Sequence, residues 1–181
     1  MSNATIYNPE NFLNTDYYSR NIAIIGRGDG NTTYKFNPNT VMVMGINDSC
    51  IFYPECEWTA IVQAHYEKNY PIVDPIVPKI LHILKSDMAK HKVVTGCTPS
   101  ILISFLIKTG KLNGKNIYLQ GFPLQGPSND LQYPYDFQRQ QKAFHLCFNL
   151  ASEYGVNLKF VTSCTRFSAD YHSNPAIEDI L

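Results

Sequence analysis

The sequence predicts one α/β domain built on an open, mostly parallel sheet with helices on both faces. Short apolar runs rich in Ile and Val recur along the chain, and segments with apolar residues at helical spacing lie between them. Glycine, proline or asparagine separates most of these segments. Strands that alternate with helices through short loops form right-handed parallel crossovers, so we expect a Rossmann-like, single-domain architecture over residues 1–181.

The composition favours a folded core and excludes several classes of partner. Of the 181 residues, 44% are hydrophobic and 17% are charged. Lys and Arg number 15, as do Asp and Glu, so no overall field attracts nucleic acid or an anionic membrane. The chain lacks the ~18 consecutive apolar residues of a membrane span and any secretory signal pattern, so we expect a cytoplasmic protein.

The five cysteines are scattered and include no CxxC pair, which is typical of idle thiols in a reducing compartment. Cys50 and Cys56 have no further Cys or His at the spacing of a zinc site. We therefore expect no bound metal ion from the cysteines.

Buried strands are expected where continuous apolar runs lie between turn residues, because a strand covered on both faces is apolar throughout. The expected strands are 21–26, 40–46, 58–64, 91–96, 115–121 and 157–162. Helices are expected over 75–85, over 99–109 with Thr98 as the N-cap, and over 136–154 before Gly155. The remaining segments are a polar leader (1–20), a long loop (123–135) and an irregular tail (164–181).

Three polar clusters follow expected strands: GRGDGNTT from Gly26, INDS from Ile46 and TGCTPS from Thr95. Open parallel sheets bind ligands at the carboxyl ends of their strands, so the clusters predict a site there. Gly26, Arg27 and Gly28 could hold a phosphate with backbone amides and a cation. The motif is neither the dinucleotide fingerprint nor a Walker loop, and a plain turn explains the glycines equally well.

The other two clusters have similar alternatives. Asn47 and Asp48 could bind a ribose or base edge, or they could cap a turn. Thr95, Gly96 and Cys97 place backbone amides at the start of a helix, where an anion is favoured, although a capped helix without a ligand also fits.

Candidate catalytic residues are His65, which follows an expected strand, and the carboxylates Asp48 and Asp136. Any of the three could be the general base. Tyr133 and Tyr135, in the long loop, could bind a phosphate through their hydroxyl groups or pack the loop against the domain.

The order of elements over residues 20–165 resembles the sialyltransferase-like nucleotide-binding fold. The segment IIGRGDGNT resembles the first strand and its Gly-x-Gly-Pro-Ser turn, with Asp29-Gly30 in place of Pro-Ser, and VMGINDS resembles the end of the second strand. The segment TGCTPSILISFLIKTGKLNGKNIYLQG resembles the later turn, helix and strand, and QKAFHLCFNLASEYGVNLKFVT resembles the last helix and strand.

This group includes bacterial sialyltransferases that use a CMP-sialic acid donor, archaeal-type hydroxymethylpterin pyrophosphokinases and small relatives of unassigned function. The resemblance implies nucleotide contacts from Gly26, Gly28, Asn47, Thr95, Gly96 and Cys97. Two departures weaken the link to sialyl transfer. Pro123 stands where the group has an acidic residue, and residues 133–138 contain no counterpart of the sialyltransferase catalytic histidine.

The residues and the resemblance together favour a transferase that moves a glycosyl or phosphoryl group from a nucleotide or nucleotide-sugar to a small-molecule acceptor. Phosphoryl transfer would bring in Mg²⁺ between the phosphate and Asp48, and no other cofactor is implied. The alternative is a non-catalytic module that senses or sequesters a nucleotide, which the two departures favour.

Overall fold

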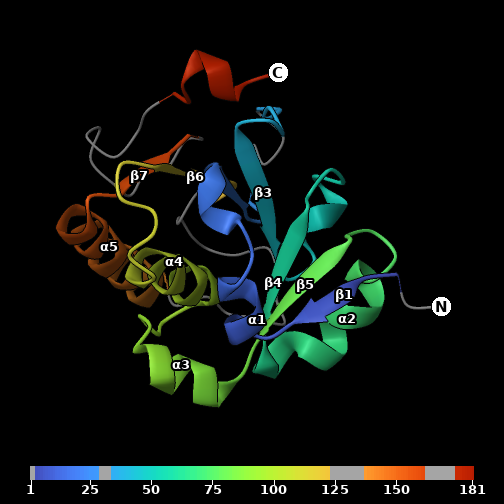
Figure 1. Ribbon diagram of the computed structural model, residues 1–181. Coiled ribbons are helices and arrows are strands. Elements are labelled where there is room, and N and C mark those ends of the chain that lie inside the picture. The colour runs from blue at the N-terminus through green and yellow to red at the C-terminus, as the bar shows by residue number, and fades with distance from the viewer. Residues whose placement is uncertain (1–2, 29–33, 123–136, 162–173) are drawn as a thin grey trace.

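The computed structural model describes residues 3–28, 34–122, 137–161 and 174–181. Its centre is a seven-stranded parallel sheet with the order β1-β5-β4-β3-β2-β6-β7 (Figure 1). The strands are β1 (Thr5–Tyr7), β2 (Asn21–Ile25), β3 (Val41–Ile46), β4 (Trp58–Val62), β5 (Lys79–Ile83), β6 (Asn116–Gln120) and β7 (Asn157–Phe160). This arrangement confirms the predicted Rossmann-like α/β fold.

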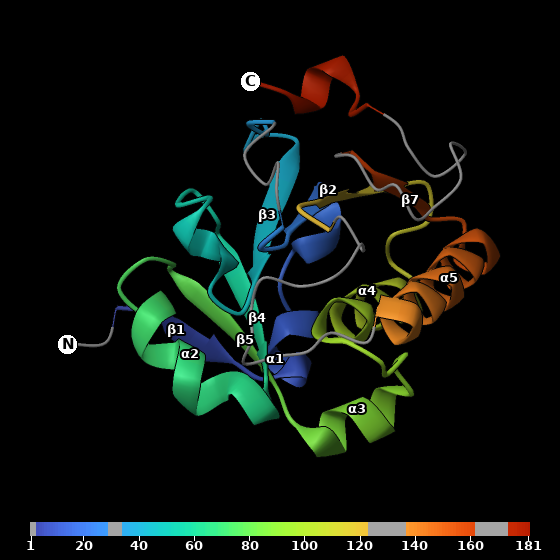
Figure 2. The ribbon, with the colours of Figure 1, turned by 180° about the vertical axis from the view of Figure 1, so that it is seen from behind.

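Helices cover both faces of the sheet, as Figures 1 and 2 show. The α-helices are α1 (Pro9–Leu13), α2 (Tyr66–Val73), α3 (Lys85–His91), α4 (Thr98–Lys108) and α5 (Phe137–Tyr154). Single-turn helices are η1 (Tyr17–Ser19), η2 (Ser49–Ile51), η3 (Gln63–His65) and η5 (Ile177–Asp179). No helix among the described residues is both long enough and apolar enough to cross a membrane.

The alternation of side chains along β2 divides the core into two layers. Ile22 and Ile24 belong to the cluster that contains the buried residues of α4 and α5. Ala23 and Ile25 belong to the cluster on the other face, with Val73 of α2. Apolar residues are therefore required at each position from Ile22 to Ile25, because successive side chains enter opposite cores.

The sequence predicted the wrong type of structure for two segments that lie between β4 and α4. The helix expected over 75–85 is strand β5, which pairs with β4 from Trp58–Lys79 to Val62–Ile83. The strand expected over 91–96 is the end of α3 and an irregular connection, in which Val94 N donates to Ser104 Oγ at 2.8 Å. The apolar run of β5 fits both periodicities, and only pairing within the sheet distinguishes them.

The expected polar leader contains the strand that occupies the sheet edge. Residues Thr5–Tyr7 form β1, which pairs in parallel with β5. The helix α1 follows at once, with Asn8 as N-cap and Pro9 in the first turn. Phe12 of α1 is fully buried, so this segment contributes to the core as well as to the sheet.

The described end of the tail is attached to the amino ends of the central strands. Phe36 and Ile180 form an antiparallel bridge, and Leu181 N donates to Lys35 O at 2.9 Å. The carboxylate of Asp179, which is 1% exposed, accepts hydrogen bonds from Tyr118 of β6 and from Asn21 of β2. Residues 174–181 therefore join β2, β6 and the approach to β3.

We predict that Asp179→Ala lowers the free energy of unfolding by about 2–3 kcal/mol, because the buried Tyr118 hydroxyl and the partly buried Asn21 amide lose their acceptor. Urea unfolding measures this change. Glu178→Ala is the matched control, since it removes a neighbouring carboxylate whose residue is exposed. Equal effects of the two substitutions would contradict the assigned role of Asp179.

We predict that Tyr118 makes the protein less stable at high pH. Burial raises the pKa of Tyr118 to about 12, and the hydrogen bond to Asp179 adds to the shift. The native state then holds this proton more tightly than the unfolded chain, whose tyrosines titrate near pKa ~10. The resulting stabilisation is complete below pH ~10 and is lost as the pH rises to ~12.

Urea unfolding between pH ~10 and ~12 tests whether Tyr118 causes this loss of stability. In Tyr118→Phe the decline should be shallower than in the parent protein, and the two should respond alike to pH below ~10. An identical decline in both proteins would show that other groups are responsible.

Candidate functional site

The strand order places a topological switch point beside β2. From β2 the chain builds outward through β3, β4 and β5, and it then crosses to the opposite side of β2 to form β6 and β7. The carboxyl ends of β2, β3 and β6 therefore meet at one place on the sheet edge. In open α/β sheets this is where ligands bind.

Backbone hydrogen bonds from Gly26 and Gly28 join the end of β2 to the end of β6, and Gly26 allows the two to approach closely. Gly26 N donates to Gln120 O at 2.8 Å, and Gly28 N donates to Gly121 O at 2.8 Å. A Cβ atom at Gly26 would lie 2.5 Å from Cε1 of Phe122. Both amides that were predicted to hold a phosphate thus donate within the chain, and the close packing explains why residue 26 is glycine.

Arg27 projects between these glycines and pairs with Asp48 at the end of β3. Its Nε lies 3.2 Å from Asp48 Oδ1. The Arg27 side chain is 51% exposed, whereas the Asp48 side chain is only 12% exposed. The structure therefore brings two of the predicted site residues together, with the carboxylate inside and the guanidinium at the surface.

The turn that presents Asp48 is fixed by hydrogen bonds. Asn47 has φ 52°, a left-handed conformation that asparagine tolerates better than most residues. Its N–H donates to Ala60 O at 3.0 Å, and its carbonyl accepts from Thr59 Oγ1 at 2.8 Å. The fully buried Ser49 accepts from Ile46 N and donates to Ile25 O, both at 2.7 Å, which ties β3 to β2.

Two buried acceptor atoms at this edge have no hydrogen-bond donor among the described residues. They are Asn47 Oδ1 and Asp48 Oδ1, the second of which has only its ion-pair contact with Arg27. Buried oxygens usually find a partner in the protein, in water or in a ligand. These atoms mark the place where a hydroxyl or amino group of a ligand would be most favoured.

His65 lies at the carboxyl end of the next strand, β4. It is the last residue of η3 and is partly buried, with α2 beginning at Tyr66. Gln63, in the same turn, accepts a hydrogen bond from Lys85 N at 3.1 Å and so links this turn to the end of β5. His65 thus shares the sheet edge with Asp48, on the adjacent strand.

Thr95, Gly96 and Cys97 precede α4, but they do not follow a strand. The N-cap is Cys97 rather than Thr98, and Ser100 Oγ lies 2.8 Å from the carbonyl oxygens of Val94 and Cys97. A Cβ atom at Gly96 would lie 2.8 Å from Cβ of Ala143 in α5. Among the described residues, Gly96 therefore allows α5 to pack closely against the chain just before α4.

The thiols of the four described cysteines are poorly suited to nucleophilic chemistry. Burial raises the pKa of Cys97, although the nearby Ser100 and Arg139 lower it in part. Burial also raises the pKa of Cys50 to about 11 and of Cys147 to about 12. The described residues contain no group of three or more His, Cys, Asp or Glu side chains that could hold a metal ion.

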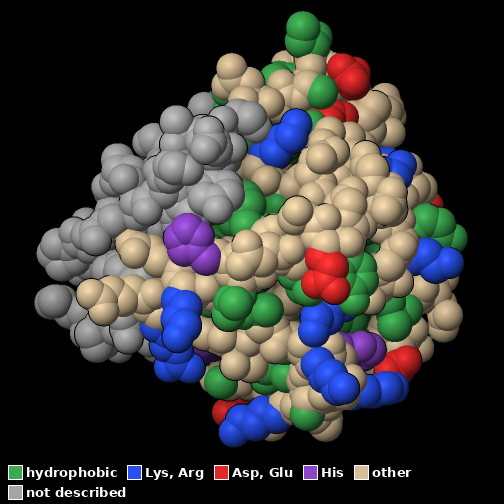
Figure 3. All heavy atoms as spheres, turned by 90° about the vertical axis from the view of Figure 1, so that its left-hand side faces the viewer, with side chains coloured by type: hydrophobic (Ala, Val, Ile, Leu, Met, Phe, Trp, Pro, Cys, Tyr) green, Lys and Arg blue, Asp and Glu red, His purple; other side chains and the backbone are tan. Residues whose placement is uncertain are grey.

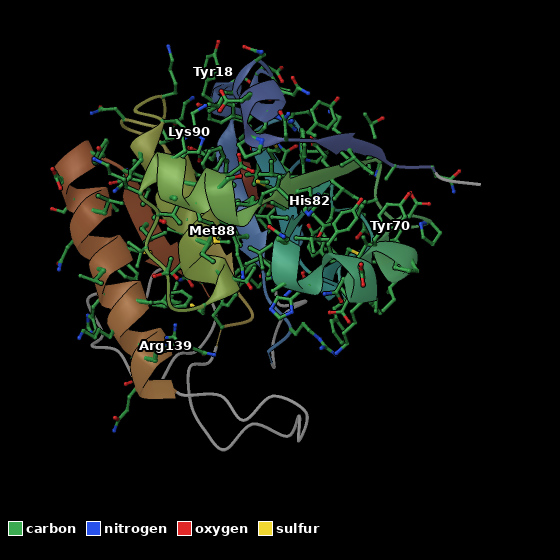
Figure 4. The ribbon with its side chains drawn as sticks, turned by 90° about the horizontal axis from the view of Figure 1, so that it is seen from below. Tyr18, Tyr70, His82, Met88, Lys90 and Arg139 are labelled. Carbon is green, nitrogen blue, oxygen red and sulfur yellow. The ribbon has the colours of Figure 1, made fainter. Side chains whose placement is uncertain are left out.

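Sequence reasoning did not identify two polar residues near this edge. Arg139 lies in the first turns of α5, and its charge acts on the Cys97 thiol (Figure 4). Gln120 ends β6, is fully buried and accepts a hydrogen bond from Tyr34 N at 3.1 Å. Gln120 could have been found from the sequence, because it is a polar residue at the end of an apolar strand. Arg139 could not, because it is one of several polar residues at the start of α5.

Three predicted site residues lie outside the described residues: Tyr133, Tyr135 and Asp136. Residues 29–33 of the GRGDGNTT cluster lie outside them as well. Of the three predicted clusters, the first two meet at the ends of β2 and β3.

Comparison with known proteins identifies one class of fold. No family model matches the chain, and no curated protein matches it. The structure is similar to that of an α-2,3-sialyltransferase from Campylobacter jejuni in its apo form, with a TM-score of 0.52 and 15% sequence identity. The similarity covers 90% of this chain and 82% of the sialyltransferase chain, which supports a sialyltransferase-like fold.

We predict that Ser49→Ala lowers the free energy of unfolding by about 1–3 kcal/mol, because it leaves Ile46 N and Ile25 O buried without a partner. Urea unfolding measures the loss. Ser86→Ala, at an exposed position in α3, is the control and should change stability little. A loss no larger than that of the control would mean that Ser49 does not hold the strand ends together.

Proposed function

We propose that the protein is a nucleotide-binding transferase that moves a glycosyl group from a nucleotide-sugar donor to a hydroxyl group of a small acceptor. The observation that carries this proposal is the similarity of fold to the sialyltransferase over 90% of the chain. Polar side chains at the switch point support it, because the donor of such a fold binds at the carboxyl edge of the sheet.

In the proposed reaction, Arg27 stabilises the departing nucleotide phosphate. The acceptor oxygen forms a bond to the anomeric carbon of the sugar, and the bond from that carbon to the phosphate oxygen breaks. The electron pair of the broken bond stays on the phosphate, where a positioned cation lowers the energy of the developing charge. Asn47 and Asp48 offer their buried oxygens to donor hydroxyl or amino groups.

We assign the general base to His65, which would take the proton of the acceptor hydroxyl. Asp48 is less suitable because its buried Oδ1 is already proposed to bind a hydroxyl or amino group of the donor. Asp136 remains a further candidate, and Tyr133 and Tyr135 remain proposed phosphate contacts. If the group transferred is a phosphoryl group instead, Mg²⁺ between the phosphate and Asp48 would supply additional charge.

A second candidate function is a non-catalytic nucleotide-binding module. The hydrogen bonds at the switch point favour it, since Gly26 N and Gly28 N donate to β6 and Asp48 contacts Arg27. In such a module Asp48 positions Arg27, and the two buried oxygens without a donor, Asn47 Oδ1 and Asp48 Oδ1, bind the ligand without moving a proton. The two functions differ in turnover of a nucleotide-sugar donor, which the transferase shows and the module does not.

We predict that one of CMP, CDP, UDP, GDP, ATP, NAD or ADP-ribose, with or without Mg²⁺, stabilises the protein. At about 100 times its Kd, a ligand contributes about 2.7 kcal/mol, which corresponds to a Tm increase of roughly 5–10 °C for a chain of this size. The matching nucleotide-sugar is then tested for transfer or slow hydrolysis. His65→Ala should abolish turnover while preserving the Tm shift.

Arg27→Gln should weaken nucleotide binding about tenfold, because a charged contact to the phosphate is lost. Lys35→Gln is the matched control, since Lys35 also forms a half-exposed ion pair, with Glu55, but lies on the chain that approaches the amino end of β3. Binding without turnover for every donor would support the module. An unchanged Tm with all of the nucleotides would exclude both functions.

A further inference from the structure

A second concave region lies away from the switch point, among α1, η1, α3 and the carboxyl-terminal half of α4. Its volume is about 330 Å³. The apolar lining residues are Leu13, Tyr17 and Phe105, of which Leu13 is partly exposed and the two rings present only 2% of their surface. This volume lies at the lower end of the range of small-molecule pockets, which begins at about 300 Å³.

The rim of this cavity carries the positive charges of Lys108 and Lys111. His91 also contributes to the lining, and no lining residue is acidic. Lys108 Nζ donates to Lys92 O at 2.6 Å, which leaves two of its three N–H groups for another acceptor. Lys111 Nζ lies 5.8 Å from the centroid of the Tyr18 ring.

Neither of these lysines forms an ion pair within the described residues. Glu10 pairs with Lys90, and its carboxylate lies 3.7 Å from Nε2 of the lining residue His91. Figure 3 shows that Lys and Arg side chains, with Asp and Glu side chains among them, are spread over the neighbouring face of the molecule. Two ammonium groups beside an apolar hollow thus remain without a carboxylate partner, although the chain as a whole has equal numbers of acidic and basic residues.

We infer that this cavity binds a small organic anion, namely a carboxylate or phosphate ester carried on an apolar body of about the size of one aromatic ring. The apolar body would contact Leu13, Tyr17 and Phe105, and the anionic group would accept hydrogen bonds from Lys108 and Lys111. Concave sites with apolar walls and a few convergent polar groups bind ligands of this kind. Charge-assisted hydrogen bonds from the two lysines fix the anionic end.

This site is separate from the proposed transferase site. In Figure 4, Tyr18 and Lys90, the sequence neighbours of the lining residues Tyr17 and His91, lie on the opposite side of the molecule from Arg139 at the start of α5. The inference does not depend on the proposed function, because none of the residues that line the cavity is assigned to nucleotide binding or catalysis.

Isothermal titration with phenyl phosphate tests the inference on the full chain. Phenol and inorganic phosphate are the matched probes that lack the charge and the ring, respectively. Phenyl phosphate should bind at least tenfold more tightly than either, because only this probe uses both the walls and the lysines. Lys111→Gln should weaken its binding about tenfold, and Lys108→Gln combined with Lys111→Gln about a hundredfold.

Lys142→Gln, at an exposed position on α5, is the control for the loss of one positive charge and should leave the affinity unchanged. Asp48→Asn, at the switch point, should also leave it unchanged, which distinguishes this site from the nucleotide site. Lys111 is exposed, so Lys111→Gln should fold normally, and an unchanged Tm without ligand verifies this. No binding of phenyl phosphate, or equal binding by the parent and Lys111→Gln, would overturn the inference.

Discussion

The main constraint on this structure is that β2 is buried on both faces and flanked on both sides, so its backbone polar groups must find partners within the chain up to the last residue. Along the strand, β3 and β6 supply these partners. Beyond its end, Ser49 Oγ donates to Ile25 O, and Gly26 N donates to Gln120 O. These two contacts hold the three strand ends in one arrangement, and the candidate site inherits its geometry from them.

This constraint also explains which groups remain for a ligand. The amides of Gly26 and Gly28 are needed to close the strand ends, so a ligand must rely on side chains. Asn47 Oδ1 and Asp48 Oδ1 lack donors among the described residues because their turn is held by other atoms, namely the backbone of Asn47 and the hydroxyl of Thr59. The site is thus built from acceptors inside and a cation outside, which is a suitable arrangement for a polar, phosphate-bearing molecule.

The sequence predicted β2 and β3 well because a fully buried parallel strand needs apolar residues at each position, and that pattern is visible without a partner strand. It could not identify β5, since Lys79–Ile83 lies in a run that also fits a helix and is distinguished only by its pairing with β4 and β1. For the site, strand ends located Asp48 and His65. The contact between Arg27 and Asp48 was not predictable, because it depends on β2 and β3 being neighbours in the sheet.

The exposure of the Arg27–Asp48 pair bears on how the proposed transferase would take up its donor. The Arg27 side chain is 51% exposed, so its guanidinium can turn from Asp48 toward a ligand while it stays in contact with water. A guanidinium can then bind a phosphate through two parallel hydrogen bonds, which are stronger than a single neutral one. Asp48 would be left as a largely buried carboxylate without its cation, and a donor that brings a hydroxyl or amino group to Asp48 Oδ1 compensates for that loss. The geometry therefore favours a ligand that carries both an anionic group and a hydrogen-bond donor, and it disfavours inorganic phosphate alone.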